Sequence, residues 1–390
     1  MKNLLDREKE LFLQTYKRIP LDIDYGKGVH LISRDGTRYL DFFSGLGVNA
    51  LGHAHPGIVA AVRKQVERFA HVSNYYITDV QLEFTEMLLM NSEMSKAFLT
   101  NSGTEAVEAA IKAVRKIKGS EGYILSLSNS FHGRTSGALS LTDRKNYKNG
   151  FEPLLPNIQT IEFNDIDNLQ VKLNSSTTAV FIEFLQGEGG INLISKKFAE
   201  LLNELCKKYG IPIIADCIQS GIGRTGKPFA YNYFDAQPDI VLVAKSIGGG
   251  LPLGAMLTKG EYESVFSYGQ HGSTFGGNPV SCAAGKVVLE EVFNNGLMNS
   301  VAKLGNYLMT ELNGIAKLFP SKINEIRGLG FMIGIEMAET CTGLVEKLFE
   351  KRVIANCTNR NVLRILPPLI ATKSDIDFFL STFHEVLKHW

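Results

Sequence analysis

Lys245 occupies a position at which a lysine can carry out amine chemistry. It follows the apolar run "VLVA" and precedes three glycines in "KSIGGG". A lysine at the end of a strand can also extend its charged head into water, and this residue alone does not decide between the two roles. A lysine at the mouth of an α/β sheet can instead do amine chemistry, and the glycines would let the backbone approach a bound group closely. The role expected of Lys245 therefore depends on what the rest of the chain supplies.

The segment "NSGTEA" offers a binding position for an anion. Gly103 and Thr104 stand at the start of an expected helix, with Ser102 as its N-cap. Free backbone N–H groups and the helix dipole favour a phosphate at such a position. An N-cap without any ligand would explain the same residues, so the segment indicates a phosphate site only in combination with others.

Two further strand ends supply an aromatic ring and a carboxylate. "SNSFHGRT" contains Phe131 and His132, although the histidine could also be a core residue. Asp216 ends the apolar run "IPIIAD", where a carboxylate is costly to bury without a cationic partner. Together these parts could hold pyridoxal phosphate: Lys245 would form a Schiff base with it, Asp216 would keep its pyridine nitrogen protonated, and Phe131 would stack on its ring.

Such residues need a sheet whose strand ends meet. Between about 96 and 258, short apolar runs alternate with helical patterns, which predicts an α/β fold with a mostly parallel sheet between helices. The runs are "KAFLT", "GYILSL", "TAVFIEF", "IPIIAD", "DIVLVAK" and "GAMLT". Ser102 and Glu105 fit a capping box for a helix that ends at Gly119, and a second helix is expected from about 196 to 210. Ligands of such sheets bind at the carboxyl ends of the strands.

Both ends of the chain predict a smaller α+β domain. Residues 1–50 would form its N-terminal part, 51–279 the large cofactor-binding domain, and 280–390 its C-terminal part. Helices are expected around "SCAAGKVVLEEVF" and strands near "FMIGIEM" and "VLRILPPL". These boundaries are soft, because neither repeats nor Pro-rich linkers mark them.

Composition narrows the class of protein. The 390 residues carry a net charge of +1 without long runs of like charge, which gives no indication of nucleic-acid or membrane binding. The five cysteines include no CxxC pair, and we expect reduced thiols rather than a disulfide framework or a zinc site, and hence a cytoplasmic protein. His53 and His55 form an H-x-H without further evident ligands, so no metal is expected.

The motifs as a set resemble the class III aminotransferases, which are fold-type-I pyridoxal-phosphate enzymes. The resemblance spans nearly the whole chain and rests on "YLDFFSGLGVNALGHAHPGIV", "LTNSGTEAVEAAIKAVRK", "FHGRTSGALSLT", "EFLQGEGGI", "IIADCIQSGIGRTGKPFA", "DIVLVAKSIGGGLPLGAM", "HGSTFGGNP" and "VLRILPPL". It departs from the commonest pattern at Cys217 and Ser220, where the family usually has Glu and Thr, and at Phe184, where it has Pro. None of these three positions carries the chemistry.

The resemblance implies roles for individual residues. Lys245 and Asp216 would be the catalytic residues. The cofactor would contact Ser102, Gly103, Thr104, Phe131, His132, Asp216, Ile218, Gln219 and Lys245, and also Thr274 from the neighbouring subunit of a homodimer with shared active sites. Substrates would contact Tyr16, Arg134, Glu188, Ser273 and Arg364.

Within the family, "FFSGLGVNALGH" and "HVSNYYITDVQ" resemble acetylornithine aminotransferases. This implies transfer of the terminal amine of N2-acetylornithine to 2-oxoglutarate, which gives N-acetylglutamate 5-semialdehyde and glutamate in arginine biosynthesis. Arg134 would bind the distal carboxylate of the donor and Arg364 the α-carboxylate of the acceptor, with Glu188 pairing with Arg364 in the first half-reaction. Leu46 would form an apolar wall suited to an acylated amine.

Other activities share the same cofactor residues. Ornithine, 4-aminobutyrate, succinylornithine and carrier-bound aminoadipate-semialdehyde aminotransferases remain alternatives. An aminomutase of the glutamate-1-semialdehyde type would keep the amine within one molecule and need no external keto acid. A relative that binds ligand without turnover is a further alternative, against which an intact Lys245 and Asp216 argue.

Overall fold

A seven-stranded sheet forms the centre of the molecule. The computed structural model describes residues 4–390. The strand order is β4-β12-β11-β10-β7-β5-β6. The strands are β4 (Lys96–Thr100), β5 (Tyr123–Leu127), β6 (Ile158–Ile161), β7 (Thr177–Ile182), β10 (Ile213–Asp216), β11 (Ile240–Val243) and β12 (Gly254–Thr258). β12 runs antiparallel to β11 and β4, while β6, β5, β7, β10 and β11 are parallel to one another. The expected α/β class with a mostly parallel sheet is therefore confirmed.

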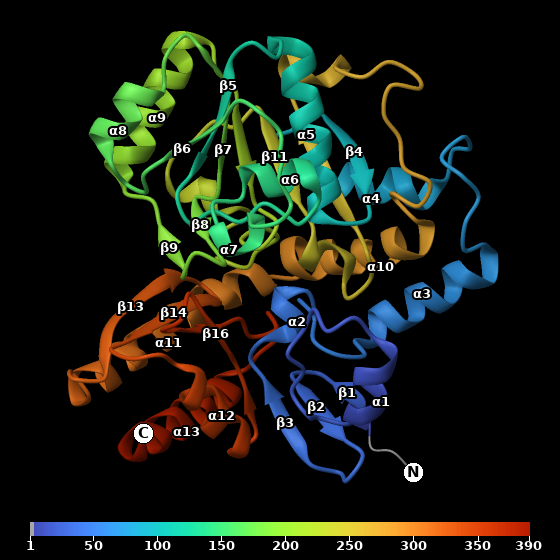
Figure 1. Ribbon diagram of the computed structural model, residues 1–390. Helices are drawn as coiled ribbons and strands as arrows, with labels where there is room; N and C mark the ends of the chain where they lie inside the picture. Colours follow the sequence, from blue (N-terminus) through green and yellow to red (C-terminus); the bar gives the residue numbers. More distant parts are fainter. Residues whose placement is uncertain (1–3) are drawn as a thin grey trace.

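Helices cover both faces of this sheet (Figure 1). Ala179 and Phe181 of β7 pack in a core with α5 (Gly103–Lys118), whereas Val180 and Ile182 pack in the opposite core with α9 (Lys196–Tyr209). Successive side chains of a strand point to opposite faces, so a strand that is apolar throughout must be covered twice. β7 begins with two threonines but is buried at all six positions, so it is covered on both faces.

The capping of α5 differs from the expectation in one bond. Ser102 Oγ accepts a hydrogen bond from Glu105 N at 3.4 Å, as expected. The Glu105 carboxylate, however, accepts from the backbone N of Asn101 at 2.7 Å rather than from Ser102. The capping box is therefore only half formed, and the glutamate instead fixes the residue before the cap.

The other helices around the large sheet are α3 (Pro56–Arg68), α4 (Asp79–Met90), α6 (Ser136–Leu141), α7 (Lys145–Lys148), α8 (Ile166–Lys172) and α10 (Pro279–Leu289). Four short helical turns accompany them: η1 (Ala230–Tyr233), η2 (Lys245–Gly248), η3 (Gly260–Ser264) and η4 (Glu290–Asn294). A two-stranded ribbon joins β8 (Leu185–Gln186) to β9 (Asn192–Leu193). No helix among residues 4–390 is both long and apolar enough to cross a membrane.

Two smaller sheets lie below the large one in Figure 1, where the blue N-terminal and the orange and red C-terminal segments meet. The first, β1-β2-β3-β15, contains β1 (Ile23–Lys27), β2 (His30–Ser33), β3 (Arg38–Asp41) and β15 (Val353–Ile354). The second, β13-β14-β17-β16, contains β13 (Ile323–Leu329), β14 (Met332–Met337), β17 (Val362–Ile365) and β16 (Asn356–Thr358). The helices here are α1 (Leu4–Leu11), α2 (Ser44–Gly47), α11 (Leu297–Leu318), α12 (Thr342–Glu350) and α13 (Lys373–His389). Since β15 pairs with β3, the two ends of the chain share a sheet; the domain boundaries at 50 and 280 stay predictions.

The expectation of five reduced cysteines was wrong. Cys341 and Cys357 form a disulfide with their Cα atoms 5.7 Å apart, and Cys206, Cys217 and Cys282 are free and buried. The bond links the N-cap residue of α12 to β16. Spacing along the chain did not reveal it, because two cysteines pair wherever the fold brings their Cα atoms to about 4.4–6.8 Å. The cytoplasmic expectation loses the support that it drew from the cysteines.

Candidate active site

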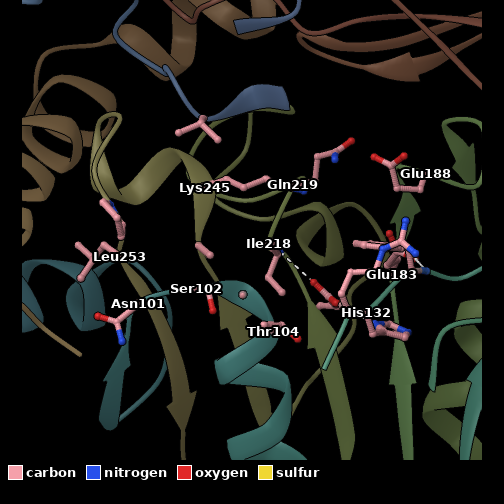
Figure 2. A pocket seen from close by; sticks show the side chains of 18 of the residues that line it. Asn101, Ser102, Thr104, His132, Glu183, Glu188, Ile218, Gln219, Lys245 and Leu253 are labelled. Atoms are coloured by element: carbon pink, nitrogen blue, oxygen red, sulfur yellow. Dashed lines mark hydrogen bonds and ion pairs between the residues drawn. The ribbon is translucent and has the colours of Figure 1, made fainter. Parts of the chain in front are cut away.

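A cavity of about 460 Å³ lies at the carboxyl ends of the parallel strands (Figure 2). It is lined by Val48, Asn101, Ser102, Gly103, Thr104, Phe131, His132, Gly133, Arg134, Glu183, Glu188, Asp216, Ile218, Gln219, Ala244, Lys245, Gly250, Leu251, Pro252 and Leu253. The edge formed by these strand ends is the usual ligand site of an open α/β sheet. The motifs around residues 101–104, 131–134, 216–219 and 244–253, which are far apart in the sequence, therefore line one cavity.

Asp216 finds its cationic partner in His132. The Nδ1 of His132 donates to Asp216 Oδ2 at 2.7 Å, and the Ile218 backbone N donates to Asp216 Oδ1 at 3.0 Å. Burial by itself would lower the pKa of His132, but the hydrogen bond and charge of Asp216 raise it above its ordinary value. The imidazolium compensates the buried carboxylate, which the two hydrogen bonds hold at the cavity wall.

Glu183 is a cavity residue to which the sequence had suggested no role. It directly follows the carboxyl end of β7, and its carboxylate accepts from the backbone N of Phe131 at 3.0 Å and of Gly187 at 3.1 Å. Burial raises the pKa of Glu183 to about 7, although the charge of His132 opposes this. Its place one residue beyond an apolar strand is the signal that could have identified it.

Lys245 has the properties of a reactive amine rather than of a solvated one. It lines the cavity as the first residue of η2, and its backbone adopts the left-handed region with φ of 51°. A non-glycine residue in that region carries strain, which is concentrated at functional sites. Withdrawal from water lowers the pKa of the Lys245 amine below its ordinary value. A larger fraction of the amine is therefore uncharged and nucleophilic near neutral pH.

The start of α5 and Ile218 together form a narrow slot. A Cβ on Gly103 would lie 2.7 Å from Cδ1 of Ile218, so glycine is required for Ile218 to pack over this helix start. The N-terminal N–H groups of α5 are available to an anion at one end of the slot, and the Asp216 carboxylate lies at the other. A phosphorylated aromatic ring with a basic nitrogen fits this set of donors and acceptors, and pyridoxal phosphate has those features.

Two arginines are placed to bind carboxylates. Arg134 lies at the exposed rim of the cavity with its guanidinium 3.5 Å from the ring centroid of Tyr147 in α7. Arg364 is 2% exposed and lies behind the cavity, where Nη1 donates to Glu188 Oε1 at 2.5 Å and to Gln219 Oε1 at 3.2 Å. Burial by itself would raise the pKa of Glu188, but the charge and hydrogen bond of Arg364 lower it. Glu188 thus occupies Arg364 as a charged carboxylate.

Four expected contacts lie away from the cavity of this chain. Tyr16 is exposed in the N-terminal segment, and Thr274 lies on the surface in a loop that packs against residues 71–74. Ser273 is nearer, because its Oγ accepts from the amide of Asn101, which lines the cavity. Leu46 does not line the cavity either, whereas Val48, two residues further on, does. The roles of all four remain predictions.

The other residues singled out in the sequence have structural partners. His53 Nε2 lies 2.8 Å from Asp41 Oδ2, and no group of three His, Cys, Asp or Glu side chains in the described part of the chain is placed to bind a metal. Phe184, the departure from Pro, is buried and packs against the rings of Tyr231 and Phe234. Cys217 and Ser220 are also buried beside the Asp216 strand.

The chain matches the family model "Aminotransferase class-III" over residues 12–387. It belongs to the class-III aminotransferases. Acetylornithine aminotransferase of Aquifex aeolicus (strain VF5) is 44% identical over 380 residues, which cover 96% of this chain and 99% of the relative. The acetylornithine aminotransferase of Methanocaldococcus jannaschii is 42% identical, with 98% of each chain covered. The resemblance inferred from the motifs is confirmed.

Solved structures agree with the fold. The ornithine aminotransferase of Toxoplasma gondii ME49 superimposes with a TM-score of 0.95 at 29% identity, covering 100% of this chain and 96% of that one. An acetylornithine aminotransferase of Elizabethkingia anophelis gives a TM-score of 0.88 at 30% identity and covers 99% and 98% of the two chains. Within this family, the fold therefore does not distinguish ornithine aminotransferases from acetylornithine aminotransferases.

Proposed function

We propose that this class-III aminotransferase moves the terminal amino group of N2-acetylornithine to 2-oxoglutarate, with pyridoxal phosphate as its cofactor. The observation that carries the proposal is the convergence of Lys245, the Asp216–His132 pair and the start of α5 on one cavity. Relatives named acetylornithine aminotransferase, at 44% and 42% identity over nearly the full chain, support the choice of donor.

The cavity residues would hold the cofactor at both ends. The N–H groups at Gly103 and Thr104 would bind its phosphate, Ile218 and Phe131 would pack against its ring, and Asp216 would keep a proton on the ring nitrogen. When bound, this group supplies the aldehyde that takes the amine and a ring that stabilises negative charge on the neighbouring carbon. The hydrogen bond from His132 Nδ1 would hold the Asp216 carboxylate in place at the cavity wall.

Lys245 would move the proton during each half-reaction. Its lowered pKa lets Nζ accept a proton from the substrate carbon and return it to a neighbouring atom near neutral pH. The proximity of Glu188 opposes that shift and Arg364 reinforces it, so the pKa of Lys245 responds to the state of this ion pair.

Two arginines would let one cavity accept two different substrates. Arg134 at the rim would bind the carboxylate of the donor, whose reacting amine lies at the far end of its chain. Glu188 occupies Arg364 meanwhile, and would release it when the α-carboxylate of 2-oxoglutarate enters. The apolar side chain of Val48, which lines the cavity, would contact the acyl group of the donor.

A homodimer would complete the site. Tyr75 is 97% exposed, Ile77 88% and Tyr268 108%, which is unusual for large apolar side chains. The two loops that carry them lie together, because Asn74 Nδ2 donates to the carbonyl of Ser273 at 3.0 Å. This surface adjoins Thr274 and would be covered by a second copy of the chain.

A panel of amine donors tests the proposal. N-acetylornithine, ornithine and 4-aminobutyrate are each supplied with 2-oxoglutarate, and kcat/KM is measured from glutamate formation. N-acetylornithine should exceed ornithine by at least ~10-fold, the lower end of what one apolar contact decides. Equal kcat/KM values for the two donors would reject the assignment. A reaction that proceeds without any keto acid would indicate an aminomutase instead.

A further inference from the structure

The short strand β16 contacts both members of the Arg364–Glu188 ion pair. In the antiparallel pairing of β16 with β17, Asn356 lies directly opposite Arg364. Two residues further along β16, Thr358 Oγ1 donates to the backbone carbonyl of Glu188 at 3.0 Å. Residues that are directly opposite in such a pair have neighbouring side chains on one face of the sheet. β16 is therefore in a position to fix the geometry of the pair.

The amide oxygen of Asn356 occupies one edge of the Arg364 guanidinium. It accepts from Nε at 3.1 Å and from Nη2 at 2.7 Å. Nη1 donates to Glu188 and Gln219 on the cavity side, where Figure 2 shows these two side chains next to each other. A guanidinium has five N–H donors in a rigid plane, so an acceptor on the Nε edge fixes that plane. The end edge, formed by Nη1 and Nη2, then points toward Glu188.

We propose that Asn356 is a positioning residue that holds Arg364 so that its Nη1–Nη2 edge receives the α-carboxylate of the keto acid. The inference rests on the proposed function, in which this carboxylate replaces Glu188. An arginine binds a carboxylate best through two parallel N–H donors, and two such edges are possible. Because Asn356 occupies the Nε edge, the end edge remains for the substrate.

The neutrality of Asn356 is as important as its position. Arg364 is 2% exposed, so water screens its charge poorly. A second carboxylate at 356 would neutralise the guanidinium permanently and compete with both Glu188 and the substrate. An amide oxygen fixes the orientation and leaves the positive charge for an incoming carboxylate.

The backbone of Glu188 is held in place while its side chain is free to exchange partners. Besides Thr358, the Nη2 of Arg144 donates to the same carbonyl of Glu188. Arg327 donates to the carbonyl of Gly190 from Nε at 3.0 Å and from Nη2 at 2.8 Å. The loop is therefore anchored at Glu188 and again two residues further along, and release of Arg364 requires rotation of the Glu188 side chain only.

The two half-reactions separate this role from a structural one. The first is followed in single turnover with N-acetylornithine, and the second with 2-oxoglutarate and enzyme loaded with pyridoxamine phosphate. The variants are Asn356→Ala, the similarly sized Asn356→Asp, and the control Asn313→Ala, which removes an exposed amide that donates to the carbonyl of Met309 in α11. The apparent Kd of each substrate and the midpoint of thermal unfolding are measured for all three variants and the wild type.

Asn356→Ala should raise the Kd of 2-oxoglutarate at least ~10-fold and leave the half-reaction with N-acetylornithine unchanged. The control variant Asn313→Ala should have the same Kd values as the wild type. Asn356→Asp should raise it further, because its carboxylate pairs with Arg364 in both half-reactions. An unchanged Kd in the aspartate variant, or an equal loss in both half-reactions, would overturn the proposal even if the alanine variant unfolds. Wild-type enzyme that reacts with 2-oxoglutarate but not with N-acetylornithine would reject the proposed donor instead. The effect of the Asn356 variants on the Kd of 2-oxoglutarate could still be measured, because enzyme loaded with pyridoxamine phosphate reacts with 2-oxoglutarate without any amine donor.

Discussion

The chemistry of this site depends on buried charges that compensate one another. Asp216, 5% exposed, lies 2.7 Å from His132 Nδ1, and the charge and hydrogen bond of Arg364 hold the pKa of Glu188 below its ordinary value. Removing one partner of a buried pair leaves the other uncompensated, which costs several kcal/mol. Burial lowers the pKa of the Lys245 amine below its ordinary value, although the nearby charge of Glu188 opposes this shift.

Replacement of that amine is the most direct test at the residue scale. Lys245→Ala should abolish transamination by more than the ~10²–10⁴-fold typical of one general acid or base, because it removes the covalent anchor and the proton carrier together. Initial rates with N-acetylornithine and 2-oxoglutarate measure this, and Lys317→Ala at an exposed position of α11 serves as the control. Turnover within about tenfold of the wild type would contradict the catalytic role.

Glu183 predicts a dependence of stability on pH. Its pKa is about 7 in the folded protein against an ordinary value of 4.5, so between these values the folded protein keeps a proton that the unfolded chain releases. The free energy of unfolding should therefore fall as the pH rises from 4.5 to 7, by at most about 3 kcal/mol. The raised pKa of His132 also makes the free energy of unfolding fall with rising pH. The stability that His132 contributes is fully present below pH 6.5, however, and is lost only above that pH.

Glu183→Gln should remove the part of this slope that lies below pH 6.5. Urea unfolding of the cofactor-free protein at pH 5, 6 and 7 measures it, with Glu346→Gln at an exposed position of α12 as the control. The unfolding free energy of the Glu183 variant should rise relative to that of the wild type as the pH increases. If the two pH profiles are parallel, Glu183 is ionised in the folded protein and the prediction is wrong.

Residue type and position at strand ends were sufficient to identify the central part of the site. Lys245, Phe131 and the Gly103–Thr104 pair could be predicted because each follows an apolar strand, and Asp216 because it ends one. Asn356 could not be found in this way, since its role exists only through the register of β16 against β17. Glu183 follows the same rule as Asp216 but lies in a motif whose second glutamate, Glu188, drew the functional interpretation.

At the scale of elements, the apolar runs predicted the strands of the large sheet well. β6 is the exception, because Ile158 and Ile161 flank two polar residues in a short edge strand. An edge strand has one neighbour and needs less apolar surface, so its pattern is weak. The disulfide is a second feature that the sequence did not predict. A separation of 16 residues does not show that two cysteines pair, because the packing of α12 against β16 brings them together.

The disulfide should stabilise the C-terminal sheet by closing that loop. A loop of about this length corresponds to roughly 3 kcal/mol in the loop-entropy model. A reductant should therefore lower the urea midpoint of the wild type, and the double variant Cys341→Ser with Cys357→Ser should unfold at the reduced midpoint with or without reductant. The buried free thiols remain in both proteins and serve as the internal control. A wild-type midpoint that does not respond to full reduction would show that the bond adds no stability.

At the scale of the whole molecule, a single chain leaves its expected site incomplete. Thr274 is exposed and does not line the cavity that contains Lys245, whereas Ser273 beside it contacts Asn101 of that cavity. The loop that carries both lies next to the exposed apolar side chains of Tyr75 and Ile77. A two-fold dimer that covers this surface would place the same loop of each copy near the other's cavity, since such an interface uses one patch on both copies.

Subunit mixing tests whether Thr274 acts across that interface. Lys245→Ala should be inactive, and Thr274→Asp should be inactive because its charge repels the phosphate of the cofactor. After subunit exchange, a mixed dimer would contain one site with Lys245 from one chain and Thr274 from the other, so the mixture should recover about a quarter of the wild-type activity.

The control for this experiment pairs Thr274→Asp with a chain that carries both substitutions. No mixed dimer in that control contains an intact site, so it should stay inactive whatever the extent of exchange. Recovery that is confined to the first mixture requires each site to draw Thr274 from the opposite chain. If exchange is verified by differently tagged subunits and the first mixture also stays inactive, Thr274 serves the site of its own chain, and the exposed apolar loops then need another partner.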